Sequence, residues 1–236
     1  MVFNKSLLIS IITLICSINA IGATYTNSLD PNHKITIETA PGMAAVTFNG
    51  QRYKLDGNTI YLDSELTDQQ AAASKFIYNN VREALEAINV GPESTTTKTI
   101  LVAPGVYWID DPDDNTDKEI GMAGLALGKF IDCPKVAIIG LAVKPEYIVF
   151  ASNRSEGFGA AGEYSMLFLI CEEVNISNIT FGNYCNTDLV YTLKKTYDHD
   201  KRTNEEVPIQ VIQNSAYKVV AENCRFVNCR MTGVKE

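Results

Sequence analysis

The aspartates between residues 110 and 117 are the densest group of chemically capable side chains in the sequence. Carboxylate oxygens are the ligands that Ca²⁺ prefers, so a cluster of this kind is a candidate calcium site. It lacks the central glycine and the distal glutamate of an EF-hand loop, which favours a solvated acidic loop instead. We therefore predict no metal site here. The cluster consists of Asp110, Asp111, Asp113, Asp114 and Asp117.

Other motifs argue against several common enzyme classes. Residues 157–162 fit the G-x-G-x-x-G pattern, but an apolar strand-like run follows them in place of the helix that a nucleotide site requires. The two histidines, His33 and His199, and the lack of a G-x-S-x-G motif argue against a serine-hydrolase triad. Trp108 and Tyr107 carry rings able to stack on a sugar, with packing inside a strand as the alternative. No cofactor is implied.

The cysteines do not form a zinc site or a small disulfide scaffold. Beyond Cys16 there are five, an odd number that leaves at least one thiol unpaired. Cys224 and Cys229 have no further Cys or His nearby to complete four zinc ligands. We expect most of the five to be buried apolar side chains, and the sequence leaves their pairing open; they are Cys133, Cys171, Cys185, Cys224 and Cys229.

The charge balance narrows the class of partner. The 236 residues include 20 Lys and Arg against 28 Asp and Glu, a net charge of −8. This balance argues against nucleic-acid binding, because no excess of cations is available to replace the counterions on phosphates. The length fits a single domain with at most a small extra element.

The first 23 residues have the pattern of a secretory signal peptide. Lys5 precedes an apolar run over residues 7–16, and cleavage is expected after Ala20 or Ala23. The run is too short for a membrane anchor, which needs about 20 apolar residues. Lipidation of Cys16 is left open, although bulky Ile15 before it fits poorly. We therefore expect a protein that is secreted, periplasmic or on the cell surface, without a membrane span.

The next segment, residues 24–66, reads as a group of short strands. Alternating runs at 34–37 and 59–62 are separated by the turn dipeptides at 41–42 and 56–57. Residues 67–90 form the one convincing helical stretch. Its apolar stripe is followed by a Gly91-Pro92 stop, and Asn79 or Asn80 can cap its start. The stripe consists of Val81, Ala84, Leu85 and Ile88.

From residue 97 onward the pattern is strands without intervening helices. Charged stretches at 110–119 and 191–206 read as long loops between them. The predicted strands cover residues 99–103, 136–141, 147–151, 166–171, 174–181, 209–212 and 217–226.

An internal repeat is the strongest architectural signal. Residues 174–183 align without gaps on residues 219–228 at an offset of 45, and a weaker copy at 136–140 lies 38 residues before the first. Each copy places two inward apolar residues before Gly140, Asn178 or Asn223, residue types that tolerate a left-handed turn. Stacked Asn side chains would then hydrogen-bond from one coil to the next. The pattern favours a parallel β-solenoid, with a β-sandwich as the alternative.

These residues, in this order, resemble the pectinesterase-type members of the pectin-lyase-like β-helix superfamily. The similarity covers residues 78–230: the helix at 81–88, the strand that ends in Pro-Gly-Val-Tyr at 104–107, and the motifs at 136–141, 151–154, 176–181 and 221–226. The resemblance implies an all-β fold, a right-handed single-stranded parallel β-helix with an N-terminal capping helix.

The resemblance also implies a reaction. Pectinesterases hydrolyse galacturonate methyl esters with an Asp nucleophile, an Asp general acid, glutamines that hold the oxyanion and an orienting Arg. The first glutamine corresponds to Gln210, and less well to Gln213, as oxyanion or substrate ligand. An outward-facing polar residue on a strand is the alternative for that position. The expected Gln-Asp pair is missing after Phe226, because no carboxylate occurs until Glu236.

Three functions stay open at this stage. The first is an exported pectin-active esterase with pectic or another acidic polysaccharide as its partner. The second is a lyase or glycosidase on the same fold, and the third is a non-catalytic glycan-binding β-helix. We expect a signal peptide at 1–23, entry strands at 24–66, a capping helix and loop at 67–96, and coils at 97–236 that continue in a longer, monomeric protein.

Overall fold

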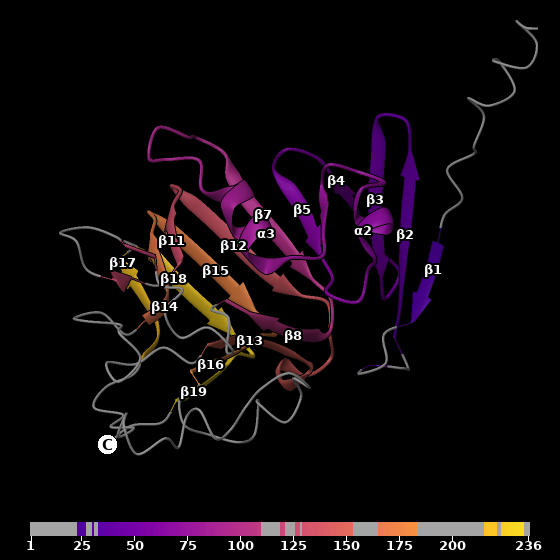
Figure 1. Cartoon of the computed structure of the whole chain (residues 1–236). Coiled ribbons are helices and arrows are strands. Elements are labelled where there is room, and N and C mark those ends of the chain that lie inside the picture. The colour runs from indigo at the N-terminus through magenta and orange to yellow at the C-terminus, as the bar shows by residue number, and fades with distance from the viewer. Residues whose placement is uncertain are drawn as a thin grey trace, which may run out of the picture.

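Strands dominate the part of the chain that the computed structural model describes (Figure 1). The described residues are 23–26, 30, 33–109, 119–120, 126–127, 129–152, 165–183, 215–220 and 223–233. Most strands pair in parallel, and helices are few and short. The prediction of an all-β chain built largely from parallel strands is confirmed.

The N-terminal strands form an antiparallel sheet in the order β1-β2-β3-β4. Pro41-Gly42 and Asn49-Gly50 close its hairpins, and Gly42, Asn49 and Gly50 have φ of 77°, 49° and 78°, values that suit glycine and asparagine. One face is apolar and buried, whereas the other carries the ion pair of Glu38 with Arg52. The strands are β1 (Ala23–Thr26), β2 (Lys34–Ala40), β3 (Met43–Phe48) and β4 (Gln51–Leu55).

The largest sheet is parallel and has six strands in the order β18-β15-β12-β7-β5-β6; we call it the six-stranded sheet. Inward positions such as Ile100, Ile138 and Ile176 lie side by side in the register and are buried. The strands are β5 (Thr59–Leu62), β6 (Ile77–Tyr78), β7 (Thr97–Val102), β12 (Lys135–Gly140), β15 (Glu173–Ser177) and β18 (Asn223–Val227).

Two more parallel sheets accompany it. The four-stranded parallel sheet has the order β19-β16-β13-β8, and the three-stranded sheet has the order β11-β14-β17. Their strands are β8 (Gly105–Trp108), β13 (Ile148–Ser152), β16 (Thr180–Asn183), β19 (Arg230–Gly233), β11 (Lys129–Asp132), β14 (Ser165–Ile170) and β17 (Ser215–Val220). A small antiparallel pair, β9 (Glu119–Ile120) with β10 (Ala126–Leu127), forms a two-stranded sheet, and β10 lies close to β14.

The chain visits the three parallel sheets in a fixed order. It passes from the three-stranded sheet to the six-stranded sheet and then to the four-stranded parallel sheet, three times over: β11-β12-β13, β14-β15-β16 and β17-β18-β19. Each pass pairs with the previous one, so a strand in one pass depends on the next pass for its hydrogen bonds and apolar contacts. We call this arrangement the parallel stack.

The predicted repeat is correct for one interval and wrong for the other. Lys135 pairs with Glu173, which gives the predicted offset of 38, but Glu173 pairs with Asn223, an offset of 50 where 45 was predicted. Asn228 therefore occupies the turn that was assigned to Asn223, and Asn223 begins a strand. The alignment at an offset of 45 matched residue types, but it set the end of β17 opposite β15, whereas the strand that pairs with β15 is β18. Predicted strands 174–181 and 217–226 each divide into two strands that belong to different sheets, β15 with β16 and β17 with β18.

The predicted single helix over residues 67–90 is wrong, because the stretch divides into two helices. Thr67 caps the short helix α2 (Asp68–Ala71) through a capping box with Gln70, and strand β6 follows. Helix α3 (Val81–Ile88) begins after Asn80, whose side chain accepts hydrogen bonds from the backbone N–H groups of Arg82 and Glu83. The predicted apolar stripe is buried, and it faces the interior of the parallel stack, within one cluster with Ile100 and Ile138.

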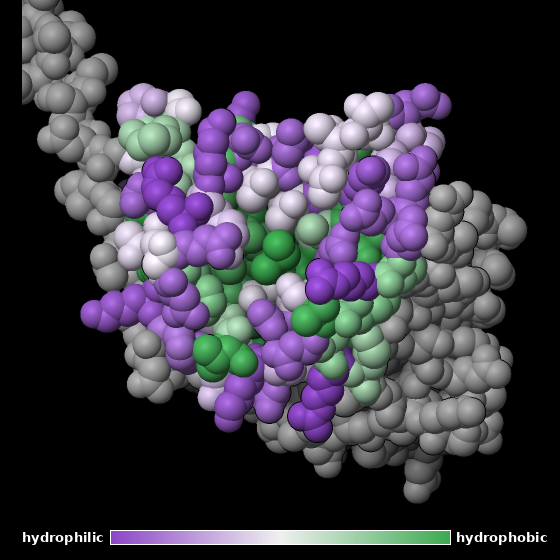
Figure 2. All heavy atoms as spheres, turned by 180° about the vertical axis from the view of Figure 1, so that it is seen from behind, coloured by the Kyte–Doolittle hydropathy of each residue, from purple (hydrophilic) through white to green (hydrophobic). Residues whose placement is uncertain are grey.

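Two apolar clusters hold the fold together. One fills the interior of the parallel stack, and the other joins the antiparallel sheet to the outer face of the six-stranded sheet through Tyr61, Leu101 and Leu141. Seen from behind, hydrophobic residues gather near the middle of the surface and hydrophilic ones surround them (Figure 2). Among the helices that the structure describes, none has the length and hydrophobicity needed to cross a membrane.

Candidate functional site

The inner side of the four-stranded parallel sheet is an aromatic row. Tyr107, Phe150 and Phe181 are neighbours in the register and are buried. Their rings meet edge to face, with centroids 5.6 Å and 5.5 Å apart. The Tyr107 hydroxyl donates to the carbonyl of Ala103 at 2.7 Å. Tyr107 is therefore part of the core and not free to stack on a ligand, and this row gives the outer side of the sheet a rigid backing.

The outer side of the same sheet carries Trp108 and Arg230. Arg230 of β19 pairs with Thr180, which pairs with Val149, which pairs with Val106. Trp108 lies two residues beyond Val106, on the same side of the sheet. Three strand intervals of roughly 4.8 Å separate β19 from β8, so the two side chains bracket about 14 Å of sheet. Trp108 is half-buried and Arg230 is exposed.

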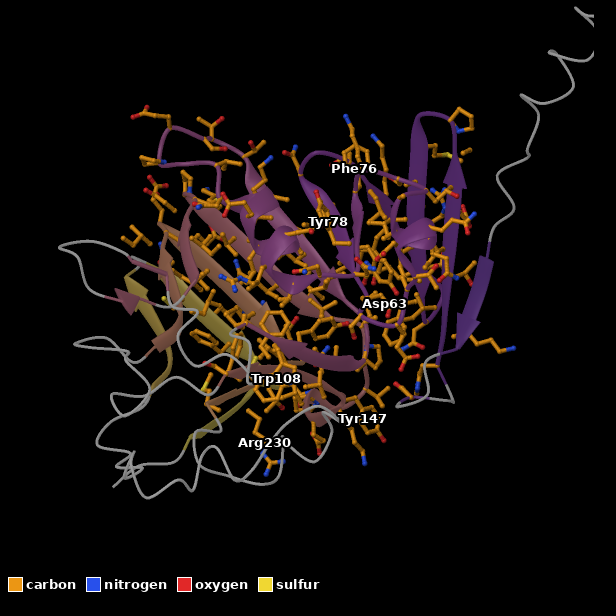
Figure 3. The ribbon with its side chains drawn as sticks, in the orientation of Figure 1. Asp63, Phe76, Tyr78, Trp108, Tyr147 and Arg230 are labelled. Carbon is orange, nitrogen blue, oxygen red and sulfur yellow. The ribbon has the colours of Figure 1, made fainter. Side chains whose placement is uncertain are left out.

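The turn before β13 carries Lys144, a second cation, and Tyr147, whose half-buried ring packs against the apolar cluster inside the parallel stack. The 3₁₀ turn η2 (Pro145–Tyr147) is held to the sheet by the Thr180 hydroxyl, which donates to the carbonyl of Pro145 at 2.9 Å. The Lys144 ammonium lies 5.9 Å from the centroid of the Tyr147 ring. Since Thr180 is the partner of Arg230, this turn lies beside the same row. Figure 3 shows Trp108, Tyr147 and Arg230 in one region of the molecule.

This group, the Trp108–Tyr147–Arg230 face, is able to bind a ligand with flat apolar faces and negative charges. Aromatic rings offer apolar area, and a guanidinium binds carboxylates through paired hydrogen bonds. Lys144 and Arg230 supply two positive charges and Glu146 one negative charge, so the face is locally positive although the chain is acidic. These three described side chains sum to one positive charge, in contrast to the net charge of −8 of the whole chain.

The turn between the six-stranded and four-stranded parallel sheets fixes where these side chains emerge. Asn178 and Asn228 have φ of 56° and 51°, and Gly140 occupies the equivalent position one pass earlier. The Asn228 amide donates to Asn178 Oδ1 at 2.8 Å, and the Asn178 amide donates to the Gly140 carbonyl at 3.2 Å. The predicted stacking of asparagines is confirmed for Asn178, with Asn228 as its partner. Arg230 follows this turn by two residues, which sets its position.

The catalytic residues implied by the resemblance are not assigned on this face. Gln210 lies outside the described residues, as do Gln213, His199, Cys185, Cys16, the aspartate cluster at 110–117 and the glycines at 157–162. Where the family has a Gln-Asp pair, the chain forms β19 with Arg230 and Met231, both exposed. No residue of β19 carries a carboxylate. The strand therefore offers a ligand the Arg230 guanidinium and backbone groups, but no carboxylate that could act as a general acid or base.

The buried acidic groups that the structure describes have local structural partners. Asp63 accepts hydrogen bonds from the Tyr61 hydroxyl at 2.8 Å and from the backbone of Glu65 at 3.0 Å, and thereby fixes the turn after β5. Asp30 lies 2.6 Å from Nδ1 of His33, whose ring packs against Phe48. His33 thus belongs to the antiparallel sheet and not to the Trp108–Tyr147–Arg230 face.

The described cysteines have free thiols and differ in burial. Cys133 and Cys171 are buried, as predicted, whereas Cys224 is exposed and Cys229 half-buried. Burial raises the pKa of the Cys171 thiol from 9.0 to about 12, and it also raises the pKa of Cys133. Such thiols are protonated and chemically inert at neutral pH. Among the residues that the structure describes, no three His, Cys, Asp or Glu side chains are grouped to hold a metal ion.

Sequence reasoning found Trp108 but missed Tyr147, Lys144 and Arg230. Arg230 lies where the resemblance implies a Gln-Asp pair, which could have marked it as a candidate site residue. Only the observed register, in which Arg230 pairs with Thr180, shows that it faces outward. Lys144 and Tyr147 flank a Pro-Glu turn that carries no recognisable motif.

Comparison with protein-family models finds no match, and comparison with curated proteins finds none either. Among solved structures, the chain is similar to the crystal structure of a pectin methylesterase mutant in complex with hexasaccharide IV. The two chains are 14% identical, with a TM-score of 0.41, and the alignment covers 74% of this chain and 49% of that chain. The chain thus spans about half the length of that protein.

Proposed function

We propose that the parallel stack is a right-handed parallel β-helix in which each pass through the three sheets is one coil. The repeated order of sheets and the in-register pairing of successive passes support this assignment. The hand follows from the strong preference of parallel crossover connections for right-handedness. A helix of coils presents long outer faces, and the Trp108–Tyr147–Arg230 face belongs to one of them.

We propose that the protein is exported and binds pectic or another acidic polysaccharide on the Trp108–Tyr147–Arg230 face. The observation that carries this proposal is the placement of Trp108 and Arg230 on the outer side of a rigid sheet, with exposed Lys144 in the turn that the Thr180 hydroxyl holds to that sheet. Aromatic rings suit the apolar faces of sugars, and Lys144 and Arg230 suit uronate carboxylates. The signal-peptide pattern at residues 1–23 supports export.

Hydrolysis of galacturonate methyl esters is the reaction we propose for the protein, on the basis of the sequence resemblance. Gln210 is the proposed oxyanion donor. Release of methanol from methyl-esterified pectin tests the reaction. An unsaturated uronate product that absorbs in the ultraviolet would show that the protein is a lyase and not an esterase. Retention of the glycan without turnover would identify a non-catalytic binding protein.

The binding proposal is tested by affinity electrophoresis in gels that contain polygalacturonate. Arg230→Ala and Trp108→Ala should each restore most of the mobility that the wild type loses. Arg225→Ala is a matched control, because Arg225 is also exposed on the last described pass but belongs to β18 of a different sheet. It should behave as the wild type does.

The outcomes separate specific binding from general charge attraction. Equal losses in Arg230→Ala and Arg225→Ala would contradict the proposed face, since both variants remove one positive charge. Trp108 is half-buried, so thermal unfolding of Trp108→Ala should be measured beside its mobility. Retention that disappears while the unfolding temperature is unchanged supports a direct role for the ring.

A further inference from the structure

A shallow groove on another part of the molecule lies between the two helices. Its volume is about 560 Å³, and α2, the segment that leads into β6, and the first turn of α3 form its walls. Ala71 and Ile77, both buried, contribute to its lining, and Tyr78 provides an aromatic wall. In the view of Figure 3, Tyr78 and Phe76 lie on the upper side, whereas Trp108, Tyr147 and Arg230 lie on the lower side.

The polar groups of the groove are mainly hydrogen-bond acceptors. Asp68 Oδ1 accepts from the Asn79 amide at 2.9 Å, which leaves its second carboxylate oxygen for a ligand. Glu83 is exposed at the start of α3 and lines the groove with its carboxylate. The Tyr78 hydroxyl donates to the Lys75 carbonyl at 3.2 Å and so presents its oxygen as an acceptor. Desolvation and the nearby Glu83 raise the pKa of Tyr78, which keeps this hydroxyl protonated.

Lys75 is the one cation that lines the groove, and its ammonium group contacts the ring of Phe76. The Lys75 ammonium lies 5.2 Å from the centroid of the Phe76 ring. Asp68 and Glu83 outnumber Lys75 by one charge, so the groove is net negative and disfavours carboxylates. A ligand that fits must have one apolar face for Tyr78 and hydroxyl donors for the acceptors, without a negative charge of its own.

We propose that this groove binds an uncharged sugar unit, as a second site that accompanies the acidic-polysaccharide face. The choice of an uncharged sugar rests on the polysaccharide-binding function proposed above, while the exclusion of a negatively charged ligand rests on the groove alone. The two sites then divide a mixed polysaccharide between them, uronate units at Lys144 and Arg230 and neutral units at Tyr78 and Glu83.

The test is a ligand-observed NMR titration of the full chain with 1,4-linked galactotriose. Trigalacturonate, of the same length, and a glucosamine trimer, which is cationic, serve as comparison ligands. Glu83→Ala should weaken galactotriose binding about tenfold, the effect of removing a charge-assisted hydrogen bond. Glu86→Ala is the matched control, because Glu86 is exposed on the same helix and does not line the groove. Tyr78→Phe, which keeps the ring, should retain most of the binding.

Each outcome decides the proposal. Equal affinity for galactotriose in wild type and Glu83→Ala, or displacement of galactotriose by trigalacturonate, would overturn it. Tighter binding of the glucosamine trimer would also overturn it, in favour of a cation site. If polygalacturonate does not retain the wild type while galactotriose binds it in a Glu83-dependent way, the acidic-polysaccharide face is refuted and the groove proposal stands. If polygalacturonate retains the wild type while galactotriose does not bind, the groove proposal alone is refuted.

Discussion

The parallel stack and the antiparallel sheet use the same kinds of residue in opposite ways. In the antiparallel sheet every strand pairs with a neighbour in the sequence, and one face is polar while the other is buried. In the three passes of the parallel stack, strands pair with partners about 30 to 50 residues away, and the apolar interior is shared between successive passes and α3. Local turns hold the first region, and long-range register holds the second.

The difference teaches where the molecule tolerates change. A hairpin strand can shift or lose a surface contact without consequences elsewhere, whereas a misplaced turn in the stack displaces every strand after it. The two regions nevertheless share an apolar cluster, in which Ile37 and Val46 pack with Leu101 and Leu141. Damage to the stack should therefore propagate to the sheet more readily than the reverse.

The largest expected effect comes from Gly140→Ala. A Cβ at this position would meet the carbonyl oxygen of Asn178 and would lie 2.7 Å from Cδ1 of Ile148. The clash involves backbone of the next pass, so we expect a loss on the order of 5 kcal/mol, enough to prevent folding. Far-ultraviolet circular dichroism and soluble yield measure it. Gly57→Ala, with nothing within 4 Å of the added carbon, is the control and should fold normally.

The second prediction compares two buried phenylalanines. Phe150 is fully buried between two rings of the stack, whereas Phe48 of the antiparallel sheet retains 9% of its exposure. Phe150→Ala should lower the free energy of unfolding by about 4 kcal/mol, because it leaves a cavity that the rigid coils cannot fill. Phe48→Ala should cost less. Urea denaturation of both variants gives the two values, and a larger loss for Phe48→Ala would reverse the ranking of the two regions.

The third prediction concerns alkaline pH. The folded Cys171 thiol has a pKa of about 12 against 9.0 for an unfolded thiol, so the unfolded chain loses this proton first as the pH rises. Stability from this group is complete below pH 9 and falls between pH 9 and 12, by about 1.4 kcal/mol at pH 10. The urea midpoint of the wild type should drop from pH 7 to pH 10 more than that of Cys171→Val. Identical drops in the two proteins would contradict the burial of this thiol in the stack.

The smallest expected effect is that of Arg52→Ala on the polar face of the antiparallel sheet. Arg52 Nη2 lies 2.8 Å from Glu38 Oε2, but both side chains are well exposed. Exposed ion pairs contribute little, so we expect a loss of about 0.5 kcal/mol that shrinks further at high salt. Thermal unfolding at low and high ionic strength checks this. A loss above 2 kcal/mol would show that this face supports the fold more than its exposure implies.

The sequence allowed much of the local structure to be predicted. Strand 59–62 and the helical stripe at 81–88 follow from alternation and from 3.6-residue periodicity, which depend on neighbours in the chain. The division of 67–90 into two helices was missed, because the stripe of α3 dominates the periodicity of a stretch that also contains β6. The turn at Asn178 was predicted, since asparagine tolerates its left-handed backbone at low cost.

The candidate site was less predictable. Trp108 was identified, together with Tyr107, as a ring able to stack on a sugar, with packing inside a strand as the alternative. Its companions were missed, since Lys144 and Tyr147 share one turn before β13 while Arg230 lies two passes later, and no spacing in the sequence brings them together. Gln210, which the resemblance implies, stays a prediction.

By itself, the sequence determined which segments are rich in strands, the tight turns at Pro41-Gly42 and Asn178, and the chain's preference for parallel repeats. These properties arise from interactions between near neighbours along the chain. Only the tertiary structure decided the offset of 50 between the last two passes, and with it the pairing of Arg230 with Thr180. The physical reason is that pairing register depends on contacts between strands dozens of residues apart, where several alignments of Val, Asn and Phe match equally well until the coils are packed.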